Sequence, residues 1–324
     1  MSTDSRLPTV HVLYENPAWL PPLVAGLEAE GFPVRLVEMV DGSLDPDEPP
    51  PEGIWLNRMS PSSHTRGHGN SVELTRETLA WLESWGRRVV NGAAAFELEM
   101  SKLRQHLAVR RHGIEAPRTV LGVGSEGLVQ LARSFDGPFI TKHNRGGKGL
   151  GIELFRSADE LADRLAAGSF DLGPDGKIVL QQYIEAPEPF ITRVEIVGGR
   201  FLFAMRSATT AGFQLCPSDA CQAPAAAPDV CPADGGASKF SLAPLTADDP
   251  LVAAYVRLCQ FEGIEVAGIE FIEDREGRRY TYDINGTTNY SGVLGARIGI
   301  DGMREVARYL RRELVPSMLT REVA

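Results

Sequence analysis

The sequence predicts an α/β protein whose first part is a parallel β-sheet with crossover helices. Short apolar runs alternate with helix-like stretches from the start of the chain to Asn91, a pattern typical of such sheets. Hydrophobic residues make up 43% of the chain and charged residues 23%, the usual mixture of a protein with a packed core. At about 150 residues per domain, the 324 residues suggest about two globular units.

The N-terminal elements follow from the residues that begin and end them. A helix-like stretch, Pro17–Glu30, stops before Gly31, and a second, Ser71–Trp85, follows Asn70, a favourable N-cap. Because strands joined by helices run parallel, the alternation predicts one parallel sheet within residues 1–92. The predicted strands are Thr9–Tyr14, Pro33–Met39, Gly53–Arg58 and Arg88–Asn91.

The remaining chain is predicted to mix helices with strands, in two further units at residues 93–182 and 183–324. One long helix is expected at Ala94–His112, because Gly113 and Pro117 follow it. A strand-rich region to Ser207 contains one good helix, opened by the cap sequence SADE. These later elements are the helices Ser157–Ala167, Leu251–Glu262 and Asp301–Leu314, and the hairpin Val266–Asn285.

Residues 208–250 break this pattern. Twenty of these 43 positions are Ala, Gly or Pro, and no hydrophobic period survives. A loop of that length inside a compact domain is uncommon and is usually functional or disordered.

Composition narrows the class of protein. A net charge of −10, from 33 basic and 43 acidic residues, argues against a broad nucleic-acid surface. No apolar run approaches the ~18 residues of a membrane span, and the first residues do not resemble a secretory signal. Four cysteines make no disulfide framework. We therefore expect a cytoplasmic enzyme that binds neither nucleic acid nor membrane, and a homo-oligomer stays open.

The sharpest chemical feature is the hairpin at residues 266–285. If Glu276-Gly277 is its centre, Glu270 lies across from Asp283, with Cβ atoms ~5 Å apart, and Asn285 shares their face. Two carboxylates and an amide oxygen suit Mg²⁺ or Mn²⁺, and like charges so close call for a cation or a raised pKa. The alternative is a solvated hairpin edge with ordinary acids. The opposite face is expected to join the core through Ile269, Phe271, Tyr282 and Ile284.

A glycine-rich turn follows the strand Pro138–Lys142. Four glycines among HNRGGKGLG form a flexible turn whose N–H groups can close on an anion, although the P-loop pattern is absent. A plain hairpin turn is the alternative. A second glycine motif, Gly122–Gly127 (GVGSEG), matches a dinucleotide fingerprint. It lacks the acidic residue ~20 positions later, so we interpret it as a loop and helix start.

In this order the pieces resemble the ATP-grasp superfamily, most closely RimK-like glutamate ligases and glutathione-synthetase-like members. SKLRQHLAVRRHGIEAPRTV resembles the helix with the first ATP lysine, and ITKHNRGGKGLGIELF the second lysine with its glycine loop. VLQQYIEA is similar to the adenine hinge, FITRVEIVGGRFLFAMR to the following strand pair, and IEF…YDIN to the metal signature. The match covers about residues 90–310.

The resemblance implies an ATP-grasp fold: an N-terminal Rossmann-like domain and two α+β subdomains that sandwich ATP. It implies ATP and Mg²⁺ or Mn²⁺ as cofactors, with two ions. The implied catalytic residues are Arg193, Arg206 and Lys142; the ATP-binding residues are Lys102, Lys142, Gly146, Gly147, Gly149, Gln181, Gln182, Tyr183, Ile184, Glu185 and Glu188; the metal ligands are Glu270, Asp283 and Asn285.

Three departures from the family pattern bear on the substrate. Gln182 stands where an acid is common, so ribose recognition falls to Glu185 or Glu188, and Ile191 stands where an aspartate is frequent. Residues 208–250 replace the usual substrate loop.

The implied activity is ATP-dependent ligation of a carboxylate to an amine, with an amino acid or peptide as substrate. ATP phosphorylates the carboxylate, and the amine displaces phosphate from the acylphosphate. Two alternatives stay open: an ATP-grasp kinase that phosphorylates a small molecule, and a nucleotide-binding module without turnover.

Substrate contacts are predicted at the carboxyl ends of the first strands and after the metal signature. Arg58, His64 and Arg66 are candidates for a substrate carboxylate. A surface loop, or a metal at His64 and His68, is the alternative. Asn289 and Ser291 occupy the family's acceptor-facing positions. In the 208–250 segment, Cys216 and Asp219 are expected to close over the acceptor, whereas Cys216, Cys221 and Cys231 could instead be small hydrophobes, a disulfide or zinc ligands.

Overall fold

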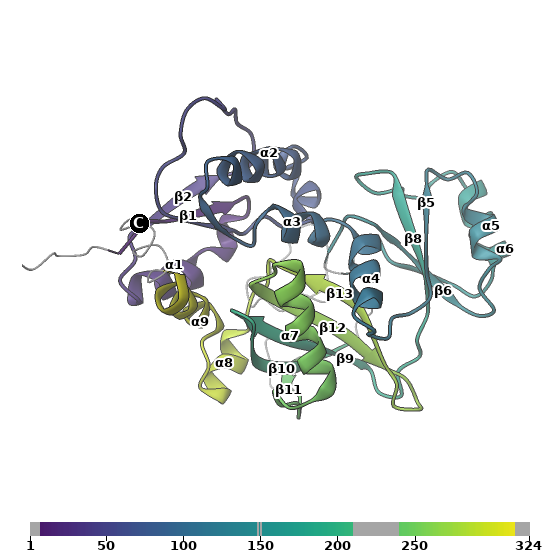
Figure 1. Cartoon of the computed structure of the whole chain (residues 1–324). Helices are drawn as coiled ribbons and strands as arrows, with labels where there is room; N and C mark the ends of the chain where they lie inside the picture. The colour runs from purple at the N-terminus through teal and green to yellow at the C-terminus, as the bar shows by residue number, and fades with distance from the viewer. Residues whose placement is uncertain (1–6, 148, 150, 210–239, 315–324) are drawn as a thin grey trace, which may run out of the picture.

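The computed structural model describes residues 7–147, 149, 151–209 and 240–314, which form three β-sheets (Figure 1). The N-terminal sheet is parallel throughout, in the order β2–β1–β3–β4, as the sequence predicts. Helix α2 (Ser71–Ser84) covers one face, and helices α1 (Pro21–Ala29) and α9 (Gly302–Tyr309) cover the other. Its strands are Val34–Glu38, Val10–Tyr14, Ile54–Asn57 and Arg88–Val90.

The C-terminal sheet is antiparallel, in the order β11–β10–β9–β12–β13. Helices α4 (Lys102–Arg111) and α7 (Pro250–Glu262) bury one of its faces, with Tyr255 and Val109 in the shared core. On the opposite face, Phe203 and Met205 of β10 pack against Leu294 of the helix at Gly292–Ile298. The strands are Phe240–Leu242, Arg200–Ala208, Phe190–Val197, Val266–Glu273 and Arg279–Asn285.

The central sheet, in the order β5–β8–β6–β7, has a core of its own with two short helices, α5 (Leu128–Ala132) and α6 (Ala158–Ala166). In Figure 1 it stands apart from the N-terminal sheet, at the far side of α4. Its strands are Thr119–Val123, Lys177–Gln182, Phe139–His143 and Glu153–Phe155.

Some helices differ from expectation. The long helix predicted at 94–112 is two helices, α3 (Ala93–Glu99) and α4, because Ser101 takes an extended conformation and its side chain caps α4 at the Arg104 amide. Asn70 precedes α2 but does not cap it with its side chain, which donates to Asp41 instead.

The ends of the chain differ as well. The stretch from Pro17 is a 3₁₀ turn (Pro17–Trp19) followed by α1, and the last predicted helix is α9 followed by a π turn at Leu310–Leu314. Helix α8 (Gly292–Ile298) was not predicted. Within the described part of the chain, no helix is long and apolar enough to cross a membrane.

The GVGSEG motif begins in the last two residues of strand β5, and from Gly124 on it is the predicted loop and helix start. Gly124 and Gly127 have φ angles of 70° and 82°, and the five-residue helix α5 follows. The preceding strand, β5, pairs antiparallel with β8, so the parallel crossover of a dinucleotide-binding unit is absent there.

Candidate active site

A cleft of about 640 Å³ opens between the C-terminal sheet, the central sheet and residues 60–62 of the N-terminal domain. All residues predicted to bind nucleotide or metal line it, together with the predicted catalytic residue Arg193 and the predicted substrate residue Asn289. Distant segments of the sequence therefore meet in one place. The nucleotide and metal residues are Lys102, Lys142, Gly146, Gly147, Gly149, Gln181, Gln182, Tyr183, Ile184, Glu185, Glu188, Glu270, Asp283 and Asn285.

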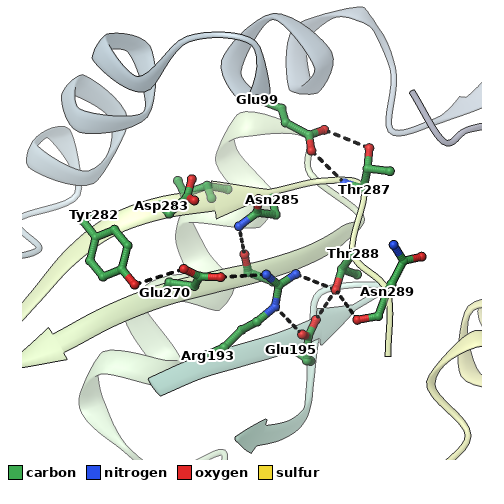
Figure 2. Close-up of polar contacts among 12 residues, drawn as sticks. Glu99, Arg193, Glu195, Glu270, Tyr282, Asp283, Asn285, Thr287, Thr288 and Asn289 are labelled. Carbon is green, nitrogen blue, oxygen red and sulfur yellow. Dashed lines mark hydrogen bonds and ion pairs between the residues drawn. The ribbon is translucent and has the colours of Figure 1, made fainter. Parts of the chain in front are cut away.

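The hairpin β12–β13 forms one wall of the cleft, and its register at this end is the predicted one. Glu270 pairs with Asp283, and the core residues Ile269 and Ile284 pair with each other. Asn285 lies on the cleft side with the two carboxylates (Figure 2). The two acids and the amide therefore share one face, as the alternation of the strands requires.

The prediction that Tyr282 packs in the core is wrong. A β-bulge follows Glu270, so Phe271 pairs with Thr281 and one residue of β13 is left without a direct partner. That residue is Tyr282, which turns into the cleft, and its hydroxyl donates to Glu270 Oε2 at 3.0 Å.

Arg193 on β9 is the centre of a buried network (Figure 2). Its guanidinium donates to Glu195 at 2.6 Å, to Glu270 at 2.8 Å and to the Thr288 hydroxyl at 2.6 Å. Thr288 in turn donates to Glu195 at 3.0 Å. Burial alone would lower the pKa of Arg193, but the two carboxylates outweigh burial and raise it. The guanidinium is thus held charged and in a fixed orientation.

The two lysines have different partners. Lys102, in the first turn of α4, forms an ion pair with Asp283. Lys142, at the end of β6, donates to the Gln181 side chain at 2.9 Å and to the Tyr282 carbonyl at 3.5 Å. Because Lys142 is buried and repelled by Lys102, its pKa is lowered to about 8.

The pKa values of the two hairpin carboxylates are shifted in opposite directions. Burial raises the pKa of Glu270 in spite of Arg193, and the charge of Asp283 raises it further. Burial also opposes ionisation of Asp283, but Lys102 and Lys142 outweigh burial and lower its pKa. The two pKa values differ because two lysines outweigh burial at Asp283, whereas Arg193 does not outweigh burial at Glu270.

The predicted adenine hinge lies at the end of β8. The Gln181 amide bridges Lys142 and the Thr119 hydroxyl, and the Gln182 side chain accepts from the Arg118 amide at 3.2 Å. Glu185 is exposed and forms a 3.0 Å ion pair with Arg275. The side chains of Gln181 and Gln182 thus both hydrogen-bond to other groups of the protein.

The glycine turn after β6 approaches the N-terminal domain. A Cβ on Gly147 would lie 3.7 Å from the Cβ of Ser62, which itself lines the cleft. Gly149 has a φ of 71°, a conformation that other residues rarely adopt. The turn thus forms one side of the cleft.

The predicted substrate residues are spread over different environments. Arg58 is buried and does not line the cleft, but it donates to the Asn289 Oδ1 at 2.7 Å, and Asn289 does. Arg66 pairs with the buried Glu15, and its guanidinium lies 5.0 Å from the centre of the Trp19 ring.

The other predicted positions within the described residues do not line the cleft. His64 lies outside its lining, Arg206 lies over the Phe190 ring at 4.3 Å, and Ser291 caps α8 through the Leu294 amide. Cys216 and Asp219 lie outside the described residues. The roles of all these residues stay predictions.

Sequence reasoning missed several cleft or network residues. Glu195 could have been found, because it is two positions from Arg193 and shares its face of β9. Glu99 had no such signal. This buried carboxylate lines the cleft, where it accepts from the Thr287 amide and hydroxyl at 3.0 and 3.2 Å, and burial raises its pKa to about 7.

The donor set of the hairpin fits a hard divalent cation. Glu270, Asp283 and Asn285 supply oxygen atoms on one face, and burial, together with the charge of Asp283, raises the pKa of Glu270. Within the described residues no three His, Cys, Asp or Glu side chains gather as a metal site, so the Asn285 amide is needed to complete the set.

Comparison with known proteins agrees with this geometry. A family model for the RimK-like ATP-grasp domain matches residues 100–214. The chain is 24% identical to beta-citrylglutamate synthase B of Danio rerio over 76% of this chain and 56% of that protein, little more than half its length. It is 26% identical to a probable alpha-L-glutamate ligase of Xanthomonas axonopodis pv. citri, over 73% and 72%.

A solved structure extends the comparison to the whole fold. The RimK domain ATP-grasp protein of Sphaerobacter thermophilus superposes with a TM-score of 0.65 at 18% identity, over 93% of this chain and 98% of that one. The fold is therefore that of an ATP-grasp protein, as the sequence predicts. More narrowly, residues 100–214 match the model of the RimK-like ATP-grasp domain. The relatives are named as a synthase and a ligase, in agreement with the predicted enzyme class.

Proposed function

We propose that this chain is an ATP-dependent ligase that joins a carboxylate to an amine. The observation that carries the proposal is one cleft lined by two buried lysines, one on α4 and one on β6, and by a carboxylate–carboxylate–amide face on the hairpin. Such a cleft suits a polyphosphate held between fixed cations and a divalent metal. The names of the relatives support the ligase reaction.

In this proposal ATP lies between the central and C-terminal sheets. The adenine lies at the hinge, where Tyr183 and Ile184 line the cleft, and the ribose contacts Glu185 or Glu188. The phosphates lie between Lys102 and Lys142, under the glycine turn with Gly146, Gly147 and Gly149. Lys142 has no carboxylate hydrogen-bonded to it among the described residues, so its charge is available to an anion.

Glu270, Asp283 and Asn285 would hold Mg²⁺ or Mn²⁺, and the family resemblance implies two ions. When bound, the metal neutralises charge on the phosphates of ATP. The protein's own part is to orient these ligands: Arg193 and Tyr282 each occupy one oxygen of Glu270, and Lys102 holds Asp283. Arg193, with Lys142, also provides positive charge for the transferred phosphoryl group. Arg206 remains a candidate for the same role.

The substrate end of the cleft lies near Asn289. Because Arg58 can only donate, it must face the Asn289 oxygen, and the amide N–H groups are left to donate elsewhere. In the described part of the chain they have no other acceptor. They would suit a carboxylate or carbonyl oxygen of an amino acid or peptide substrate. L-glutamate is the first candidate, since a relative is named as a glutamate ligase.

The test is product analysis. Protein, ATP, Mg²⁺ and a panel of amino acids that includes L-glutamate are incubated, and ADP release is measured with mass spectrometry of the products. The ligase reaction predicts ADP only together with an amide-linked product. ADP with a phosphorylated small molecule would favour a kinase, and nucleotide binding without turnover would favour a non-catalytic module.

A further inference from the structure

The outer edge of strand β13 has no neighbouring strand: the Thr281 amide donates to the Glu115 carbonyl at 2.8 Å, and side chains bind the end of the strand. On its inner edge β13 pairs with β12, and on its outer edge Ile284 meets the Gln105 side chain of α4. The Gln105 oxygen accepts from the Ile284 amide at 3.0 Å, and its nitrogen donates to the Ile284 carbonyl at 2.9 Å. One amide side chain thus satisfies both backbone groups of one residue.

Two more side chains continue this row beyond Ile284. Asn91 donates to the Gly286 carbonyl at 3.0 Å, and Glu99 accepts from the Thr287 amide at 3.0 Å (Figure 2 shows Glu99 with Thr287). Like Gln105, both are buried and come from the short stretch of chain that carries α3 and α4. The row therefore fixes the strand end and the turn after it.

Ile284 is the residue between Asp283 and Asn285. Its own side chain lies in the core, so the two neighbouring side chains point to the cleft, and the Ile284 backbone sets their spacing. An edge strand without partners frays, and a shift of a fraction of an ångström at Ile284 would move both ligands. Gln105 also lies one turn from Lys102, whose ammonium donates to it at 3.4 Å.

We propose that Gln105 is a positioning residue that sets the geometry of the metal ligands Asp283 and Asn285 through the Ile284 backbone. The inference rests on the proposed function, because it needs the hairpin to hold a metal. Replacing a residue that orients a metal ligand without touching the metal typically changes metal affinity by about 10–100-fold.

Three variants test this role. Gln105→Met keeps the length of the side chain but removes both hydrogen bonds. Gln105→Glu keeps an acceptor for the Ile284 amide and loses the donor. Val109→Ala is the matched control: Val109 lies on the same helix, is equally buried and packs in the same core as Ile284, but makes no side-chain hydrogen bond.

Two measurements separate an effect on the position of the metal ligands from an effect on the stability of the fold. Mn²⁺ binding in the presence of ADP is measured by electron paramagnetic resonance, and backbone exchange by hydrogen–deuterium mass spectrometry of peptides that contain residues 280–288. We expect Gln105→Met to weaken Mn²⁺ binding by about 10-fold or more and to speed exchange at Ile284. Gln105→Glu should lie between Gln105→Met and the wild type. ADP affinity without metal should stay within about twofold of wild type, and Val109→Ala should bind Mn²⁺ like wild type.

Each other result counts against the inference. Faster exchange with wild-type Mn²⁺ affinity would make Gln105 a structural residue only, and an equal loss in Val109→Ala would assign the effect to core packing. If Gln105→Met does not fold, the same two measurements on Gln105→Glu test the inference. Wild-type protein that binds no Mn²⁺ with ADP would overturn the metal site itself and the inference with it, whereas wild-type binding with unaffected variants overturns the inference alone.

Discussion

The C-terminal sheet and the central sheet form opposite walls of one cleft, but they are held in different ways. The C-terminal sheet shares its core with α4 and α7, and buried side chains such as Asn91 and Gln105 bind its backbone from the N-terminal part of the chain. The central sheet has a separate core, and Asn144 is a main link from it to α4.

This difference suggests that the two walls differ in rigidity. From the separate cores we expect the wall that carries Arg193, Glu270 and Asp283 to be fixed and the wall that carries Lys142 and the glycine turn to move as a unit. We propose three structural parts, as in the sequence-based division at residues 92 and 182. In the packing, however, α3 and α4 lie with the C-terminal sheet and the N-terminal domain.

The largest expected effect is loss of the metal face on the fixed wall. Asp283→Ala should lower ATP turnover by at least about 10³-fold, because the metal would lose a charged ligand and Lys102 its partner. Glu273→Gln, an exposed carboxylate of the same hairpin, is the control and should keep wild-type turnover. Turnover that is independent of metal, or that survives Asp283→Ala, would argue against this site.

The two lysines should respond differently, because only Lys102 has an ion-pair partner on the fixed wall. Lys102→Met leaves Asp283 partly buried without its cation, so we expect a loss of roughly 3 kcal/mol in the free energy of unfolding. Lys142→Met should cost little stability, while both should weaken ATP binding by about 10-fold or more. Denaturant unfolding and nucleotide titration measure the two effects, and equal stability of the two variants would remove the distinction.

The separate core of the central sheet can be tested by truncation. Leu161, on α6, is fully buried there, and Leu161→Ala should destabilise that subdomain by about 2–5 kcal/mol. Hydrogen exchange should speed up in β5–β8 and stay unchanged in β9, β12 and β13. Equal acceleration in both sheets would mean that the two walls unfold as one unit.

The sequence predicted local pairing well and distant contacts poorly. Glu270 opposite Asp283 follows from alternation and turn position, which are local. The bulge that turns Tyr282 into the cleft could not be predicted, because no glycine or proline marks it in the sequence. The Arg58–Asn289 bond joins residues 231 positions apart, and the Gln105–Ile284 bonds join residues 179 apart. Such contacts depend on how the sheets pack, which no short pattern encodes.

The smallest expected effect is a pH dependence that belongs to Lys142 alone. Its pKa is lowered to about 8 from 10.5 by burial and by Lys102, so its ammonium is charged at pH 7 and largely neutral at pH 9. ATP affinity should therefore fall by up to about 10-fold between these pH values, as one cation near the phosphates is lost.

The stability of the protein without nucleotide should change in the opposite direction. Between pH 8 and about 10 the unfolded chain, with an ordinary lysine pKa, binds more protons than the folded chain. Stability therefore rises with pH over this window, because the cost of burying a charged Lys142 disappears. Lys142→Met should lack both trends, so the difference between wild type and variant isolates them from other titrating groups. If the variant keeps the wild-type pH dependence of ATP affinity, Lys142 does not face the phosphates, and the moving wall of the cleft does not carry the cation that we assign to it.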